Sequence, residues 1–276
     1  MPYLRRLFLV PPEFEDALSA DLWSAGTLGV RSDSAPDGRV LLEAWFAPEA
    51  PAVEIDWPGT ELTAEEVVPE TDWLAVYRER AQPFAVASTL FVDPREPEEP
   101  AIAAPAGRTL LRLPARAAFG IGSHESTSLA LELIETLDLA GKSVLDAGTG
   151  TGVLCFAALL RGARLAVGYD VDPASPFHAR DNSRLNGFRP LLFAGFSNAL
   201  RDAPRFDLAL INIVPEQILP EMPALTRLLR PGGELILSGI LAERGRQVLD
   251  RMRGLGYEEV DRREAGDWVA FRVAPS

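Results

Sequence analysis

The chain has 276 residues, of which 47 % are hydrophobic, with one cysteine, two histidines and a formal net charge of −13 at pH 7. A single cysteine excludes an internal disulfide, and no Cys/His cluster has metal-ligand spacing, so we expect no metal site. No apolar run approaches the ~20 residues that span a bilayer. The N-terminal stretch MPYLRRLFLVPPEFEDAL is too acidic after its short apolar part to be a secretion signal. We therefore expect a cytoplasmic protein without membrane contact.

The negative charge is concentrated in the first third of the chain. Residues 1–100 hold 7 arginines and 20 acidic residues, whereas residues 101–276 hold 20 basic and 20 acidic residues. Nucleic-acid affinity comes largely from Lys and Arg side chains that neutralise phosphates, so this surface disfavours direct binding of DNA or RNA. The acidic surface either favours solubility or steers a basic partner toward the protein.

The first sixty residues predict a small α+β unit. A strand is expected at residues 3–10 (YLRRLFLV) and a helix at 13–26 (EFEDALSADLWSAG). Two short strands follow, around residues 28–32 and 39–46, with PDG as the turn between them.

Residues 61–100 are interpreted as a linker. The middle of the stretch ELTAEEVVPETDWLAVYRERAQPFAV predicts one helix, with Trp73, Val76 and Tyr77 along one side. Prolines and charges then crowd residues 93–107 (DPREPEEPAIAAPAG), which disfavours regular structure. This composition places a domain boundary near residue 100.

Residues 101–276 show a regular alternation of apolar runs and helical segments. The apolar runs are SVLDA, LAVGYD, PLLFAG, FDLALIN and ELILSG. Strands that alternate with helices are typical of βαβ units, and hence of a doubly wound parallel sheet covered on both faces. The last stretch, GYEEVDRREAGDWVAFRV, has two strand-like runs with no helix between them and predicts a C-terminal antiparallel hairpin.

Three glycines follow the first of these strands in VLDAGTGTGVL, residues 144–154. The strand ends at Asp146, and Gly148, Gly150 and Gly152 precede a helical segment, at the point where doubly wound sheets bind ligands. Glycine lets the chain turn tightly and brings backbone N–H groups close to a ligand. A dinucleotide site requires G-x-G-x-x-G, and its third glycine is Val153 here. The spacing therefore does not fit NAD.

A second carboxylate supports another nucleoside ligand. Asp170 ends the next strand, where an acidic side chain can accept hydrogen bonds from both ribose hydroxyls. No Lys or Ser/Thr of the Walker type is present to hold a triphosphate. A nucleoside without phosphates and with a positive charge fits best, and S-adenosyl-L-methionine is such a ligand.

Several motifs resemble one family of class I methyltransferases. AAFGIGSHESTSLALELIETL resembles the phenylalanine-glycine-x-glycine-x-histidine block of the PrmA-type enzymes that methylate large-subunit ribosomal protein eleven. Three further stretches are similar to other blocks of that family, namely FDLALINIV, RPGGELILSGIL and DWLAVYRERAQPFAV. The resemblance implies a seven-stranded, mostly parallel α/β sheet with the antiparallel hairpin, preceded by a small α+β domain of ferredoxin-like type.

The resemblance also implies functional residues. Thr127, Gly148, Asp170 and Asn212 stand at the positions that contact S-adenosyl-L-methionine, and Phe119, Gly120, Gly122, Asp146, Gly150 and Gly152 surround them. Asn212 would in addition orient the acceptor amine as the one catalytic residue. On the residues alone, the Thr127 hydroxyl serves equally as a helix cap. His124 is either a proton acceptor or a residue that shapes the pocket and starts the helix, and Cys155 is a small buried apolar residue.

The chain departs from the family pattern after Asn212, where Pro215, Glu216 and Gln217 replace small residues. A divergent paralogue with another protein substrate and a non-catalytic binding module remain alternatives. The expected function is transfer of methyl groups to lysine or N-terminal amines of ribosomal protein eleven, by a monomer. Residues 1–60 would recognise the basic substrate, residues 61–100 would form a linker with a helix, and residues 101–276 would form the methyltransferase domain.

Overall fold

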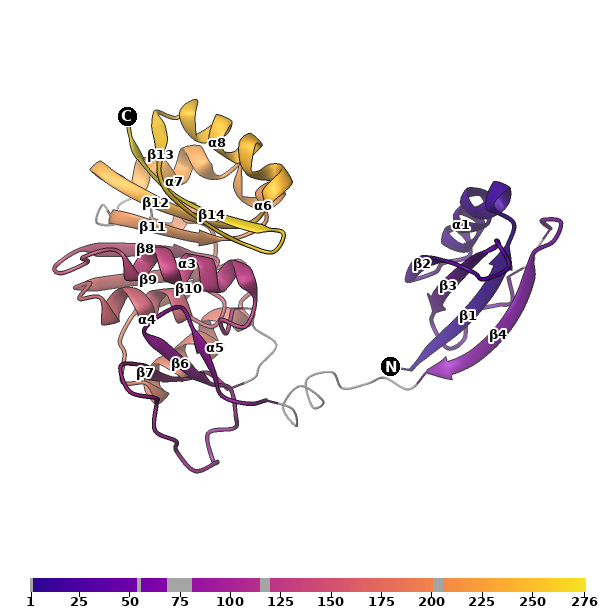
Figure 1. The fold of residues 1–276 in the computed structure, drawn as a ribbon, viewed down its shortest axis with the longest axis horizontal. Coiled ribbons are helices and arrows are strands. Elements are labelled where there is room, and N and C mark those ends of the chain that lie inside the picture. Colours follow the sequence, from indigo (N-terminus) through magenta and orange to yellow (C-terminus); the bar gives the residue numbers. More distant parts are fainter. Residues whose placement is uncertain (1, 54–55, 69–80, 115–119, 201–205) are drawn as a thin grey trace. The chain divides into compact units, whose positions relative to one another are not determined.

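A computed structural model describes residues 2–53, 56–68, 81–114, 120–200 and 206–276. Contacts between Cα atoms divide the chain into an N-terminal unit, Met1–Trp73, and a C-terminal unit, Leu74–Ser276. Figure 1 draws the first unit in indigo to purple and the second from purple through orange to yellow. Each unit has its own hydrophobic core.

The N-terminal unit is a four-stranded antiparallel sheet with one α-helix on it. The chain runs through β1 (Tyr3–Val10), η1 (Pro12–Phe14), α1 (Glu15–Ser24), β2 (Gly29–Ser34), β3 (Val40–Phe46) and β4 (Glu61–Val68). The strand order is β2-β3-β1-β4, which is the ferredoxin-like order. Alternate residues of β1, from Leu4 to Val10, are buried under α1, as the period of two in a half-covered strand requires.

A buried arginine of β1 holds the connection between β3 and β4 on this face of the sheet. Arg6 is 3 % exposed, and its guanidinium lies 4.8 Å from the centre of the Phe46 ring. It donates to the Pro51 carbonyl oxygen at 2.7 Å and to the Glu65 carboxylate at 2.6 Å. These hydrogen bonds fix the connection between β3 and β4 against the sheet.

The division of the chain differs from the predicted one. Residues 61–68, which belong to the predicted linker, form β4, because Tyr3–Leu9 of β1 pairs with them along an antiparallel ladder. The proline-rich residues 93–107 also lie within a unit, since they connect the neighbouring parallel strands β6 (Leu90–Asp93) and β7 (Thr109–Arg112). The boundary near residue 100 is therefore wrong. The predicted helix around Trp73, Val76 and Tyr77 lies outside the described residues.

The C-terminal unit is built on a seven-stranded sheet with order β10-β9-β8-β11-β12-β14-β13. These strands are β8 (Ser143–Ala147), β9 (Leu165–Asp170), β10 (Leu191–Ala194), β11 (Phe206–Asn212), β12 (Leu229–Leu241), β13 (Tyr257–Ala265) and β14 (Trp268–Pro275). The first five pair in parallel, and β14 runs antiparallel to β12 and β13. The predicted seven-stranded sheet and the C-terminal hairpin are confirmed.

Both faces of the central strands of this sheet are buried. Along β11, Leu208 and Leu210 join one apolar cluster, whereas Ala209 and Ile211 join the other. The first cluster includes α3 (Glu125–Glu135), α4 (Val153–Leu160) and a small sheet of β5 (Phe84–Val86), β6 and β7; the second includes α6 (Pro215–Ile218), α7 (Met222–Leu228) and α8 (Gly245–Arg253). Among the described residues, no helix has the length and apolar content needed to cross a membrane.

Candidate functional site

The glycine-rich segment connects β8 to α4 at the carboxyl edge of the sheet. Gly148, Gly150 and Gly152 have φ values of 73°, 50° and 86°, a region that residues with a Cβ rarely adopt. A Cβ on Gly148 would lie 2.6 Å from Ile213 Cδ1, and one on Gly152 would lie 2.8 Å from Phe156 Cζ. Both conformation and space therefore require glycine at these two positions.

Backbone hydrogen bonds fix this loop against the next strand. The N–H groups of Gly148 and Thr149 both donate to the Tyr169 carbonyl oxygen, at 2.9 and 3.0 Å. Asn182 of α5 (Ala174–Leu185), which is 3 % exposed, donates from Nδ2 to the Thr151 carbonyl oxygen at 3.0 Å. The loop is thus rigidly held before any ligand binds, which lowers the entropic cost of binding.

Asp146 lies beneath the loop and is fully buried. Burial raises the pKa of this carboxyl from 3.8 to about 6, although a hydrogen bond from the Thr149 hydroxyl, at 2.8 Å, acts in the opposite direction. A Cβ on Gly168 would lie 2.5 Å from that hydroxyl oxygen, so this glycine makes room for it. Near neutral pH the site therefore holds a buried carboxylate with little solvation.

This raised pKa predicts a pH-dependent stability. Between pH 4 and pH 6 the folded state keeps the Asp146 proton while the unfolded state has lost it, so this group destabilises the fold as pH rises. We expect the wild type to lose roughly 2 to 3 kcal/mol relative to Asp146→Asn between pH 4 and pH 7. Urea unfolding of both proteins at the two pH values measures the difference. An equal loss of stability in both would contradict it.

Asp170 ends β9 beside the loop. Its Oδ2 accepts a hydrogen bond from the Gly150 N–H at 3.0 Å, and its Oδ1 accepts one from the Asp172 N–H at 3.0 Å. The side chain is only partly buried, so its remaining lone pairs face accessible space. The carboxylate is oriented by the backbone and can still accept hydrogen bonds from a ligand.

Thr127 and Asn212 meet from elements 85 residues apart in the sequence. Asn212 ends β11, and its Nδ2 donates to Thr127 Oγ1 at 3.0 Å. Thr127 is fully buried, and Asn212 Oδ1 is buried without a hydrogen-bond partner among the described residues. An unpaired buried acceptor costs free energy. We therefore expect Asn212 Oδ1 to accept a hydrogen bond from a bound ligand.

The alternative interpretation of Thr127 as a helix cap is wrong. His124 is the N-cap of α3, because its Nδ1 accepts a hydrogen bond from the Ser126 N–H at 3.2 Å. The His124 ring also packs edge-on against Trp268, with 4.7 Å between ring centres. His124 thus caps the start of α3, which is one of the two roles predicted for this residue. Cys155 is buried, and burial raises the pKa of its thiol well above the usual value.

Gly120 and Gly122 precede α3, with φ values of 96° and 99°. A Cβ on Gly122 would lie 3.3 Å from the Val86 side chain. Gly120 is bonded to the glycine loop, because the Thr151 hydroxyl donates to its carbonyl oxygen at 2.6 Å. Phe119, the other residue expected here, lies outside the described residues.

The predicted residues that the structure describes thus gather at and beside the carboxyl ends of β8, β9 and β11. Sequence reasoning missed Thr151, Asn182 and Ser238, whose side chains hydrogen bond to this region. Their signal is weak because Ser, Thr and Asn are common in turns and helices for local reasons. The described side chains and loop of this site offer carboxylates, an unpaired amide oxygen and a tightly packed glycine backbone, and none of the site residues named above is a lysine or an arginine. This chemistry fits a cationic nucleoside that lacks phosphates.

Comparison with known proteins gives the family. The model of the family described as ribosomal protein L11 methyltransferase (PrmA) matches residues 47–275. Ribosomal protein L11 methyltransferase of Pseudomonas paraeruginosa is 33 % identical to this chain over 272 residues, which cover 90 % of this chain and 90 % of the relative. The Geobacter metallireducens protein of the same name is 34 % identical over 266 residues, covering 92 % of this chain and 86 % of its own.

A solved structure agrees with these matches. The crystal structure of ribosomal protein L11 methylase from Lactobacillus delbrueckii subsp. bulgaricus superposes with a TM-score of 0.62 at 27 % identity, and the match covers 70 % of this chain and 98 % of that one. The chain therefore belongs to the PrmA family of class I methyltransferases, which are S-adenosyl-L-methionine-dependent enzymes.

Proposed function

We propose that this enzyme transfers methyl groups from S-adenosyl-L-methionine to amino groups of ribosomal protein L11, on lysine side chains, the N-terminus or both. The observation that carries the proposal is the unpaired Asn212 Oδ1 beside Thr127, at the same sheet edge as the glycine loop and Asp170. The relatives that match along most of this chain bear the name of that activity.

The chain's own groups suit each part of the cofactor. Asp170 would accept hydrogen bonds from the ribose hydroxyls, and Gly148, Gly150 and Gly152 would let the backbone approach the ligand closely. Asp146 would contribute a negative charge under the loop, and Thr127 and Asn212 would contact the ligand at the end of β11. Gly120, Gly122 and Phe119 would shape the pocket around it.

When bound, S-adenosyl-L-methionine supplies a methyl group that its sulfonium has already activated. The protein must therefore mainly hold the acceptor amine in line and keep water out. A lysine amine has an unperturbed pKa of ~10.4 and an α-amine one of ~7.7 to 8.0, so the amine must first lose a proton. Asn212 Oδ1 would accept an N–H of the neutral amine and direct its lone pair toward the methyl group.

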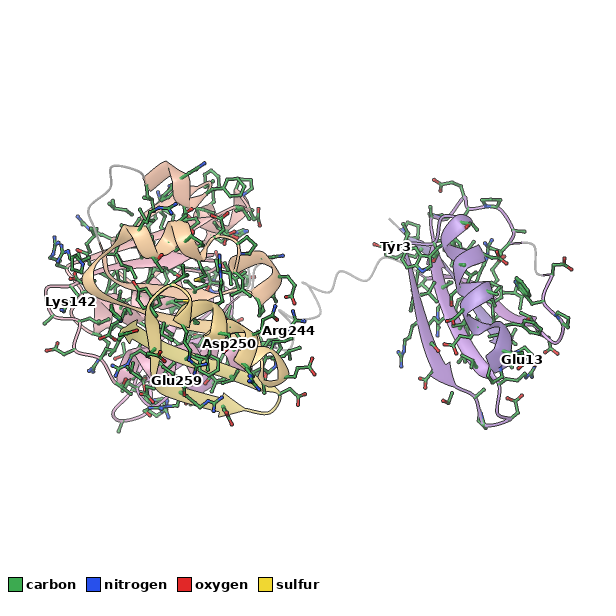
Figure 2. The ribbon with its side chains drawn as sticks, turned by 90° about the horizontal axis from the view of Figure 1, so that it is seen from above. Tyr3, Glu13, Lys142, Arg244, Asp250 and Glu259 are labelled. Atoms are coloured by element: carbon green, nitrogen blue, oxygen red, sulfur yellow. The ribbon has the colours of Figure 1, made fainter. Side chains whose placement is uncertain are left out.

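The N-terminal unit would recognise the substrate. It holds 4 arginines and 15 acidic residues, a formal charge of −11. Ten acidic side chains are exposed on its described part, among them Glu13, labelled in Figure 2. Ribosomal proteins are commonly basic because they bind RNA phosphates, so charge would steer such a substrate to this unit. We propose a cytoplasmic monomer that binds neither nucleic acid nor membranes.

Asp170→Ala is expected to weaken cofactor binding by about 1 to 3 kcal/mol, the cost of hydrogen bonds lost from a charged group. Calorimetric titration with S-adenosyl-L-methionine measures the dissociation constant. Asp181→Ala is the matched control, because it removes the same charge from an exposed position of α5. A dissociation constant unchanged by Asp170→Ala would remove this residue from the site.

Incubation of unmethylated ribosomal protein L11 with the enzyme and labelled S-adenosyl-L-methionine, followed by peptide mapping, tests the function. We expect label on lysine or N-terminal amines of that protein. Label on another protein of a ribosomal extract, with none on L11, would favour the divergent paralogue. Cofactor binding without any transfer would indicate a non-catalytic module.

A further inference from the structure

Residues 120–127, which we call the strap, cross the carboxyl edge of the central strands. The strap begins with two glycines of positive φ, passes the helix cap at His124 and ends in the first turn of α3. Side chains that lie far away in the sequence hydrogen bond to it at Gly120, Ser126 and Thr127. They come from the loop after β8, from the end of β11 and from β12. We call each of these hydrogen bonds a fixed point of the strap.

The first fixed point joins the strap to the glycine loop. Thr151 is fully buried, and its hydroxyl donates to the Gly120 carbonyl oxygen at 2.6 Å. Thr151 is itself held from behind, since its own carbonyl oxygen accepts from Asn182 Nδ2 at 3.0 Å. A Cβ on Gly120 would lie 3.8 Å from the Thr151 hydroxyl oxygen, which is an ordinary van der Waals contact.

The second fixed point lies on β12. Ser238 is 1 % exposed, and its hydroxyl donates to the Ser126 carbonyl oxygen at 2.7 Å. Ser126 immediately precedes Thr127, whose hydroxyl oxygen accepts from Asn212 at the third fixed point. In the parallel register of β11 and β12, Asn212 and Ser238 are partners. Neighbouring strands therefore hold consecutive residues of the strap.

We propose that Thr151 and Ser238 are positioning residues that hold the strap, and through it Thr127, over the cofactor site; this inference rests on the proposed function of that site. Each hydroxyl donates to a backbone carbonyl oxygen. Removing either one breaks a hydrogen bond that joins the strap to the sheet and its loops, which favours departure of the strap. Neither residue needs to touch the cofactor for the effect.

Thr151→Val tests the proposal, with Thr151→Ser as the matched control. Valine keeps the branched shape of threonine but removes the hydroxyl, whereas serine keeps the hydroxyl. Hydrogen exchange of the cofactor-free protein reports on the amides of residues 120–123, and calorimetry gives the dissociation constant for S-adenosyl-L-methionine. We expect Thr151→Val to speed that exchange and to raise the dissociation constant, each about tenfold, and Thr151→Ser to restore both.

Ser238→Ala provides an independent second variant, with faster exchange at residues 125–128 as the expected result. Exchange in β8 and β9 serves as the internal standard, since a general loss of folding would raise it too. The inference would be overturned if Thr151→Val had the hydrogen-exchange rates of the wild-type strap and the wild-type dissociation constant for S-adenosyl-L-methionine. A wild-type protein that binds no S-adenosyl-L-methionine would instead overturn the proposed function, while the exchange data still show whether the hydroxyls hold the strap.

Discussion

A chain that begins at residue 74 is expected to bind S-adenosyl-L-methionine within about twofold of the full-length affinity and to lose at least about a hundredfold in the rate of L11 methylation. The glycine loop, Asp170 and the Thr127–Asn212 pair all belong to the C-terminal unit, so their hydrogen bonds survive the truncation. The removed unit carries 15 of the 40 acidic residues and only 4 of the 27 basic ones. Its loss removes the surface proposed to attract the basic substrate.

The place of the truncation matters. A deletion of residues 1–60 would leave β4 without its partner β1 and expose an unpaired strand, which promotes aggregation. Calorimetry measures cofactor binding, and a labelled-methyl assay under conditions of excess enzyme measures transfer. Full methylation of L11 by the truncated chain would refute substrate recognition by the N-terminal unit.

Asn212→Ala is expected to lower kcat/KM for methyl transfer by about a hundredfold, since it removes the group proposed to orient the amine and also the donor to Thr127. Asn212→Asp separates the two roles. It keeps an oxygen at the position of Oδ1 and lets the Thr127 hydroxyl donate to the new carboxylate. We expect this variant to keep more activity than Asn212→Ala at equal thermal stability.

The comparison of both variants requires cofactor affinities as well as rates. If Asn212 orients the amine, kcat falls further than cofactor affinity does in Asn212→Ala. If saturating S-adenosyl-L-methionine restores the full methylation rate of Asn212→Ala, then Asn212 only binds the cofactor.

Local patterns were sufficient to predict the framework of the C-terminal unit. Short apolar runs such as residues 206–212 are separated by helical segments and buried on both faces, so each run identifies one strand and their alternation implies the parallel sheet. The glycine loop was also predictable, because the positive φ values at Gly148 and Gly152 leave little alternative to glycine. The resemblance to a family then placed Thr127 and Asn212, which no local pattern links.

Other features depend on long-range contacts and were missed. Strand β4 is exposed on most of its length and carries three glutamates, so only its ladder with β1 reveals it as a strand. The prolines of residues 93–107 indicate an irregular segment but not that its two ends enter parallel neighbours. Ser238 reaches the Ser126 carbonyl oxygen across 112 residues, and only the folded sheet brings them together.

The most direct test of the cofactor site is a crystal structure of the full-length enzyme with S-adenosyl-L-homocysteine. We expect the ligand against residues 148–152, with its ribose hydroxyls on the Asp170 carboxylate and its amino-acid part near Thr127. A ligand bound elsewhere, or no ligand at the carboxyl edge of the sheet at saturating concentration, would contradict the proposed cofactor site.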